Sequence, residues 1–170
     1  LQKSIRKVEN SFEIVVVDNG STDETPRIIE SLKKELPYLT TTHVFPNQGY
    51  GNGILAGLAI AKGEVVGWMH ADNQVKPEDV VRVYQKLRNE NLDFCKATRV
   101  IRNENLFRIA QSKVYNIFFR LLFAARCGDI NGSPKFFRRS LYEAAHLNSK
   151  DWFIDPEIVI KAMRLRAKIC

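Results

Sequence analysis

The chain has 170 residues, 45% of them hydrophobic, which is enough for one folded domain over residues 1–170 and excludes a disordered chain. No apolar stretch reaches the roughly 18 residues of a membrane-spanning helix, and three widely spaced cysteines exclude a disulfide framework, so we expect a reducing, cytoplasmic location. The net charge is +7, with 12 basic and 13 acidic residues before position 99 and 14 basic and 6 acidic residues from there on. This basic second part favours nucleic acid, phospholipid or a phosphorylated acceptor as partner, unless it is a solvated face.

Strands and helices are expected to alternate along the first part of the chain. Short runs of β-branched and apolar residues predict buried strands at 13–17, 41–45, 65–69 and 93–98. Helices are expected between them, the first opening with a capping box of Ser21 and Glu24. This order predicts an α/β fold with a mostly parallel sheet flanked by helices. Further elements are expected as a long aromatic-rich helix, a strand and two helices, at 103–126, Lys135–Arg138, 140–147 and 156–167.

A first polar cluster directly follows the first predicted strand, where open α/β sheets bind ligands. It consists of Asp18, Asn19, Gly20 and Ser21. A carboxylate at this point can accept a hydrogen bond from a base imide or a ribose hydroxyl, and Gly20 permits close approach of the backbone. The alternative is that Asp18 and Ser21 only cap the following helix.

A second cluster is the glycine-rich turn at residues 47–53. Glycines before a helix can cradle a phosphate at the helix N-terminus. The spacing of Gly49, Gly51 and Gly53 is G-x-G-x-G, which differs from the dinucleotide-binding fingerprint G-x-G-x-x-G. Taken alone, the segment is therefore interpreted as a turn.

A third cluster follows the strand at 65–69. Alternate residues of an extended segment share a face, so His70, Asp72 and Gln74 would point together. Carboxylate and amide oxygens suit a hard divalent cation that also contacts phosphates, and histidine suits Mn²⁺ better than Mg²⁺. The alternative is a polar loop without a metal.

The order of these segments resembles that of family 2 glycosyltransferases, which have the GT-A fold. The segments are VVVDNGSTD at 15–23, NQGYGNG at 47–53, MHADNQ at 69–74, DINGSPKFFRR at 129–139 and FIDPE at 153–157. The resemblance covers about residues 10–168 and is greatest to the dolichol- and undecaprenyl-phosphate sugar synthases. Thr98 and Arg99 stand where those enzymes have a Ser-Arg pair, and Arg108 and Ser112 match their Arg-x-x-x-Ser pair.

The resemblance implies a role for each cluster. The donor nucleotide-sugar would contact Asp18, Asn19, Gly20, Ser21, Gly49, Gly51, His70, Ala71 and Asp72. Mg²⁺ or Mn²⁺ would be held by Asp72, Gln74 and His70. The acceptor phosphate would be held by Arg99, Arg108 and Ser112, where an arginine and a hydroxyl one helical turn apart suit a phosphate. Asp129 and Asp72 would act at the reacting centre, and Asp155 and Glu157 would lie near the acceptor.

The reaction implied is an inverting, metal-dependent transfer of a sugar from a UDP- or GDP-linked donor to a polyprenyl phosphate. The acceptor phosphate is already an anion at neutral pH, so it needs positioning more than a general base. A hydroxyl acceptor would instead need a base, for which Asp129, Asp155 and Glu157 are the candidates.

Two departures from the family pattern matter. His70 stands where the family has aspartate, so a catalytically impaired nucleotide-sugar-binding domain is the alternative function. The first strand and the Pro-x-x-Asn-Glu segment of the family are also absent, so the chain is expected to be a fragment that begins inside the first helix, at residues 1–10, and lacks the C-terminal end.

The predicted helix at 103–126 has two interpretations. Its aromatic and basic residues suit a helix that rests on anionic lipid, which would make the protein peripheral on the cytoplasmic face of a membrane. Alternatively, it is an amphipathic helix packed on the sheet. No nucleic-acid-binding motif is present, so nucleic acid is not expected as a partner.

Overall fold

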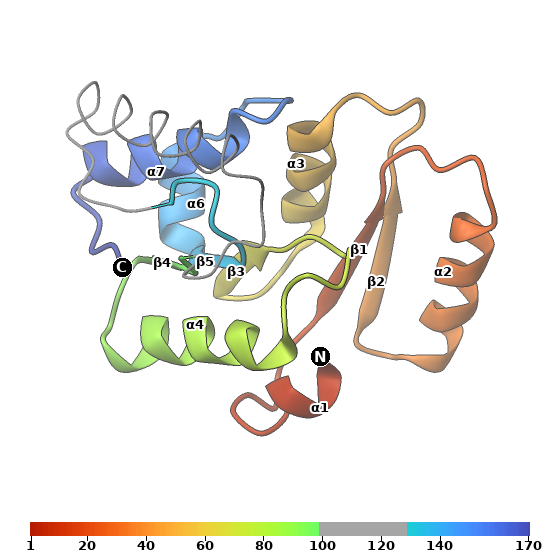
Figure 1. The fold of residues 1–170 in the computed structure, drawn as a ribbon, viewed down its shortest axis with the longest axis horizontal. Helices are drawn as coiled ribbons and strands as arrows, with labels where there is room; N and C mark the ends of the chain where they lie inside the picture. The colour runs from red at the N-terminus through yellow and green to blue at the C-terminus, as the bar shows by residue number, and fades with distance from the viewer. Residues whose placement is uncertain (99–128) are drawn as a thin grey trace, which may run out of the picture.

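The computed structural model describes residues 1–98 and 129–170, in which strands and helices alternate as predicted for an α/β fold (Figure 1). The elements are α1 (Gln2–Ile5), β1 (Ile14–Asp18), α2 (Thr25–Glu35), β2 (Leu39–His43), α3 (Tyr50–Ile60), β3 (Val65–Trp68), α4 (Pro77–Asn89), β4 (Phe94–Lys96), β5 (Lys135–Arg138), α6 (Arg139–Ala145) and α7 (Ile154–Arg164). The predicted helix at 103–126 lies outside the described residues.

Within the described part of the chain, the strands form two sheets. β1 and β2 pair in parallel, with Asp18 opposite His43 at the carboxyl end. In the other sheet the order is β3-β5-β4, and β5 runs antiparallel to both neighbours. β3 and β4 therefore share one direction without pairing. The parallel pairing that the sequence predicts is present between β1 and β2. In the second sheet, β5 lies between β3 and β4 and pairs antiparallel with both.

Helices cover both sheets, and the core lies around the second. α2 and α3 flank the β1–β2 pair, and α3 also contacts β3 (Figure 1). Gly57 lets α3 approach β1 closely, because a Cβ at that position would lie 2.8 Å from Val17 Cγ2. Phe94, Phe137 and Ile158 are fully buried between the β3–β5–β4 sheet and α7. α3 therefore contacts a strand of each sheet.

The start of α2 differs from the prediction. The helix begins at Thr25 with Glu24 at the N-cap position, so Ser21 lies three residues too early to cap it and the capping box is not formed. Instead, the Asp23 side chain accepts a hydrogen bond from the Thr25 backbone N–H at 3.0 Å. α1 is likewise only Gln2–Ile5, shorter than the helix expected over residues 1–10. Within residues 1–98 and 129–170, no helix combines the length and apolar character needed to cross a bilayer.

Candidate functional site

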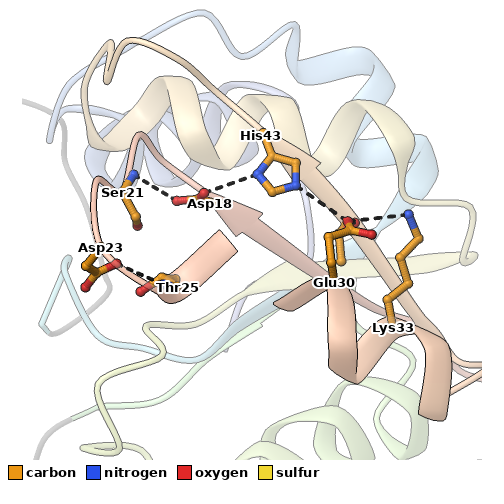
Figure 2. Close-up of polar contacts among 8 residues, drawn as sticks. Asp18, Ser21, Asp23, Thr25, Glu30, Lys33 and His43 are labelled. Carbon is orange, nitrogen blue, oxygen red and sulfur yellow. Dashed lines mark hydrogen bonds and ion pairs between the residues drawn. The ribbon is translucent and has the colours of Figure 1, made fainter. Parts of the chain in front are cut away.

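Asp18 is a buried carboxylate at the carboxyl end of β1. Its Oδ1 accepts a hydrogen bond from the Ser21 backbone N–H at 3.0 Å, and its Oδ2 lies 3.1 Å from His43 Nδ1 (Figure 2). Hydrogen bonds from the Ser21 side chain and backbone lower the pKa of Asp18, His43 lowers it further, and together they outweigh the opposing effect of burial. The carboxyl group is therefore ionised at neutral pH and can accept hydrogen bonds from a ligand.

The loop after β1 packs against the glycine-rich turn. Gly20 has a φ of 85°, and a Cβ there would lie 2.8 Å from the Asn47 backbone nitrogen. The Asn19 Nδ2 donates to the Gly49 carbonyl at 3.1 Å, while its Oδ1 is buried without a hydrogen-bond partner among the described residues. Because the N-cap position of α2 is Glu24, the alternative that Asp18 and Ser21 only cap this helix is wrong.

The glycines of the turn allow a second loop to approach. A Cβ at Gly51 would lie 2.3 Å from the Ser149 carbonyl oxygen, and one at Gly49, where φ is 105°, would lie 2.5 Å from the Lys150 carbonyl oxygen. The Asn52 backbone N–H donates to that same Lys150 carbonyl at 3.0 Å. This packing is a sufficient reason for glycine at both positions, and their contact with a nucleotide stays a prediction.

The segment after β3 turns instead of continuing as a strand. Asn73 has a φ of 61°, and Asp72 Oδ1 accepts a hydrogen bond from the Gln74 backbone N–H at 3.1 Å. The premise that His70, Asp72 and Gln74 lie on one face of an extended segment is therefore wrong. The physical reason is that asparagine tolerates the left-handed conformation and so permits the turn.

Asp72 and Gln74 are exposed, whereas His70 belongs to an aromatic stack. The Tyr50 ring stacks with the His70 ring at 5.3 Å and with the Trp152 ring at 4.3 Å, with nearly parallel planes in both pairs. Burial, followed by the negative charge of Asp155, raises the pKa of Tyr50, so its phenol stays protonated. Sequence reasoning did not single out Tyr50 or Trp152, because nothing in their local pattern connects residues a hundred positions apart.

A buried group of charges lies at the end of the second sheet. Lys135 Nζ and Asp155 Oδ1 are 2.6 Å apart, and Trp68 Nε1 donates to the same oxygen at 3.2 Å. Lys96 Nζ donates to the Asp129 backbone carbonyl at 3.0 Å. Burial lowers the pKa of Lys135, and the Asp155 carboxylate opposes that shift. Sequence reasoning missed Lys96 and Lys135, although a lysine within an apolar strand is a signal of a buried partner.

Glu157, expected near the acceptor, organises the loop before α7. Its carboxylate accepts hydrogen bonds from the backbone N–H groups of Asn148 and Ser149, and Lys161 Nζ lies 2.6 Å away. Burial opposes ionisation of Glu157 most strongly, but Lys161 and the loop donors together outweigh it and lower the pKa. Glu157 thus stabilises the loop that packs on the glycines of α3.

The sequence model described as "Glycosyl transferase family 2" matches residues 1–145. The chain belongs to this family. It is 27% identical over 134 residues to an undecaprenyl-phosphate 4-deoxy-4-formamido-L-arabinose transferase of Klebsiella pneumoniae (strain 342), covering 78% of this chain and 41% of the relative. The transferase of the same name from Proteus mirabilis (strain HI4320) is 29% identical over 147 residues, covering 84% and 44%. The chain therefore spans less than half the length of these curated relatives.

The GT-A fold is supported by solved structures. The family 2 domain superposes on Staphylococcus aureus TarS 1–349 in complex with UDP with a TM-score of 0.66 at 22% identity, covering 99% of this chain and 52% of that one. The TarS 1–349 complex with UDP-GlcNAc gives a TM-score of 0.62 at 21% identity, covering 99% and 50%. The predicted fold and family are thus confirmed.

The predicted acceptor-phosphate and metal sites lie only in part within the described residues. Arg99, Arg108 and Ser112 lie outside the described residues. Within residues 1–98 and 129–170, no three histidine, cysteine or acidic residues gather into a metal-binding group. Asp72 nevertheless fits Mg²⁺ or Mn²⁺, because such ions are held by one or two carboxylates and complete their shell with phosphate oxygens and water.

Proposed function

We propose that this family 2 domain binds a nucleoside diphosphate sugar and transfers the sugar, with inversion, to a polyprenyl phosphate. The observation that carries the proposal is Asp18, an ionised carboxylate at the carboxyl end of a parallel strand, held by hydrogen bonds from Ser21 and His43. Such a group accepts from the N–H of a uracil or guanine base. The relatives named for undecaprenyl-phosphate and the TarS structures with UDP and UDP-GlcNAc support the two substrate classes.

The chemistry follows from the charges of the substrates. An oxygen of the acceptor phosphate attacks the anomeric carbon as the nucleoside diphosphate leaves from the opposite face. The acceptor is already an anion, so the domain has to position it rather than deprotonate it. Mg²⁺ or Mn²⁺ at Asp72, with His70 and Gln74 beside it, would neutralise charge on the diphosphate. Asp129, which lies beside Lys96, is proposed near the reacting carbon.

Acceptor binding is assigned to the basic second part of the chain. We propose that Arg99, Arg108 and Ser112 hold the acceptor phosphate, because guanidinium and hydroxyl groups suit phosphate oxygens. The net positive charge of residues 99–170 would favour an anionic membrane surface, in agreement with a lipid acceptor. We therefore propose that the protein works at the cytoplasmic face of a membrane.

A second candidate is a nucleotide-sugar-binding domain with impaired catalysis. His70 supports it, because an imidazole stands where the family has a carboxylate and its ring stacks on Tyr50. A neutral imidazole neutralises less metal charge than a carboxylate does, and this would weaken metal binding to the diphosphate.

The test is calorimetric titration of UDP and GDP into the full-length protein, with and without Mn²⁺ or Mg²⁺. We expect metal-dependent binding of one nucleotide, lost in Asp72→Ala and weakened in Asp18→Ala. Absence of binding under every condition would contradict the proposal. Sugar transfer to a polyprenyl phosphate then separates the two candidates, since the impaired domain would bind the donor without turnover.

A further inference from the structure

His43 faces the Asp18 carboxylate across the β1–β2 pair. The two residues are opposite one another in the parallel register, and His43 Nδ1 lies 3.1 Å from Asp18 Oδ2 (Figure 2). An ionised carboxylate only accepts hydrogen bonds, so the hydrogen of this contact is on His43 Nδ1. His43 is therefore a donor to the group proposed to recognise the base.

The other side of the imidazole faces α2. His43 Nε2 lies 3.7 Å from Glu30 Oε1, and the same Glu30 oxygen accepts a hydrogen bond from Thr41 Oγ1 at 3.1 Å. Lys33 Nζ is also 3.7 Å from that oxygen. The side chains form one row, Asp18–His43–Glu30, from the buried strand end to the exposed helix (Figure 2). Glu30, held by Thr41, thus borders the imidazole on the side away from Asp18.

We propose that His43 is a positioning residue for donor recognition, which rests on the function proposed for Asp18. Asp18 Oδ1 accepts a hydrogen bond from the Ser21 backbone N–H and Oδ2 accepts one from His43, and the Ser21 side chain donates a further hydrogen bond to the carboxylate. A carboxylate has about four lone-pair sites, so about one remains for a ligand, in a direction that these donors determine. His43 thereby orients the carboxylate that accepts from the base.

The ligand class follows from this geometry. Uracil and guanine carry a ring N–H that can donate to the fixed carboxylate, whereas the corresponding ring nitrogens of cytosine and adenine are acceptors and would be repelled. A carboxylate free to rotate would discriminate less, because it could turn toward water or toward an exocyclic amino group. His43 is thus expected to increase both affinity for, and selectivity toward, a uridine or guanosine diphosphate.

A matched pair of substitutions tests the contribution of the Nδ1 donor to nucleotide binding apart from that of Nε2. In His43→Asn the side-chain amide reaches the position of Nδ1 and can donate to Asp18, whereas in His43→Gln it reaches the position of Nε2. We expect His43→Asn to bind UDP or GDP within about twofold of wild type, and His43→Gln and His43→Ala to bind roughly tenfold more weakly, as for a lost hydrogen bond to a charged group. Discrimination against CDP and ADP should fall in parallel.

Three controls distinguish the loss of the His43 hydrogen bond from unfolding of the variant and from failure of the proposed function. Thermal melting of the Asn and Gln variants should agree, because His43 is partly exposed and both amides are accommodated there. Lys33→Ala, which changes only a neighbour of Glu30, should bind like wild type. In an Asp18→Ala background, His43→Ala should cause no additional loss.

Each other outcome decides against the inference. Equal affinity of the Asn and Gln variants, whether high or low, would overturn it, because the Nδ1 donor would then have no special role. Weak binding by Asp18→Ala combined with wild-type binding by His43→Ala and His43→Gln would overturn the role of His43 and leave the proposed base site standing. Wild-type binding by Asp18→Ala would overturn both.

Discussion

Asp18 in the β1–β2 sheet and Lys135 in the β3–β5–β4 sheet are both buried charges at strand ends, but their surroundings differ. The partners of Asp18 reach solvent, since the His43 side chain is 42% exposed and Glu30 beyond it is 48% exposed. Lys135 and Asp155 are at most 5% exposed in their side chains. In the second sheet both members of the ion pair are therefore enclosed by the chain, whereas in the first sheet an equally buried carboxylate has partners that reach solvent.

The difference indicates two uses of a buried charge. An enclosed pair loses its hydration completely, so each member depends on the other and removal of one is strongly destabilising. A carboxylate with partly hydrated partners loses less when it is altered, and its free lone pairs can serve recognition. We expect substitutions in the second sheet to change stability first, and substitutions in the first sheet to change nucleotide binding first.

The largest effect is expected for Asp155→Ala, which leaves the Lys135 ammonium buried without its carboxylate. The free energy of unfolding should fall by about 3–5 kcal/mol, measured by urea denaturation. The double variant Lys135→Met/Asp155→Leu, which removes both charges and keeps apolar volume, should recover most of that loss. A loss below about 1 kcal/mol in Asp155→Ala would contradict the enclosed-pair description.

Glu157→Gln should be the next most destabilising, at about 2 kcal/mol for lost hydrogen bonds to a charged group at neutral pH. Because folding lowers the pKa of Glu157 below its ordinary 4.5, its stabilisation is complete above that pH and is lost as the pH falls through the lowered value. The difference in unfolding free energy between wild type and variant should therefore shrink below about pH 4.5. Denaturation at several pH values tests this, and a difference that grows toward acid pH would contradict it.

Gly51→Ala probes the junction between α3 and the loop before α7. Its Cβ would lie 2.3 Å from the Ser149 carbonyl oxygen, so backbone must move, and we expect a cost of about 1–3 kcal/mol. Gly53→Ala is the matched control, because its nearest neighbours are atoms of the Asn19 side chain at 3.1 Å or more. Equal melting temperatures for both variants would show that the loop does not need this close approach.

The smallest effect on stability is expected for Asp18→Asn, below about 1 kcal/mol, because the amide oxygen can still accept from Ser21 and the partners are hydrated. Nucleotide affinity should nevertheless fall by roughly tenfold or more with the loss of the charged acceptor. Parallel denaturation and calorimetry test the contrast with Asp155. A variant that unfolds easily but retains nucleotide affinity would reverse the comparison between the sheets.

The local parts of the site could be predicted from sequence. The run of β-branched residues before Asp18 places a carboxylate at the end of a buried strand, and Lys135–Arg138 matches β5 as predicted. The order of short motifs identified the family over most of the chain, which the family match confirms. These signals depend on neighbours within a few positions, where hydrophobic period and turn residues decide the backbone.

Other features depended on contacts that local patterns do not encode. A single left-handed residue, Asn73, turned the segment after β3 away from the predicted extended form. The place of β5 between β3 and β4 decided that Lys135 would lie beside Trp68 and meet Asp155. The sequence by itself determined which strand ends carry polar groups. Only the tertiary structure decided which distant side chains meet there, such as His43 at Asp18, because strand pairing brings together residues that no local pattern connects.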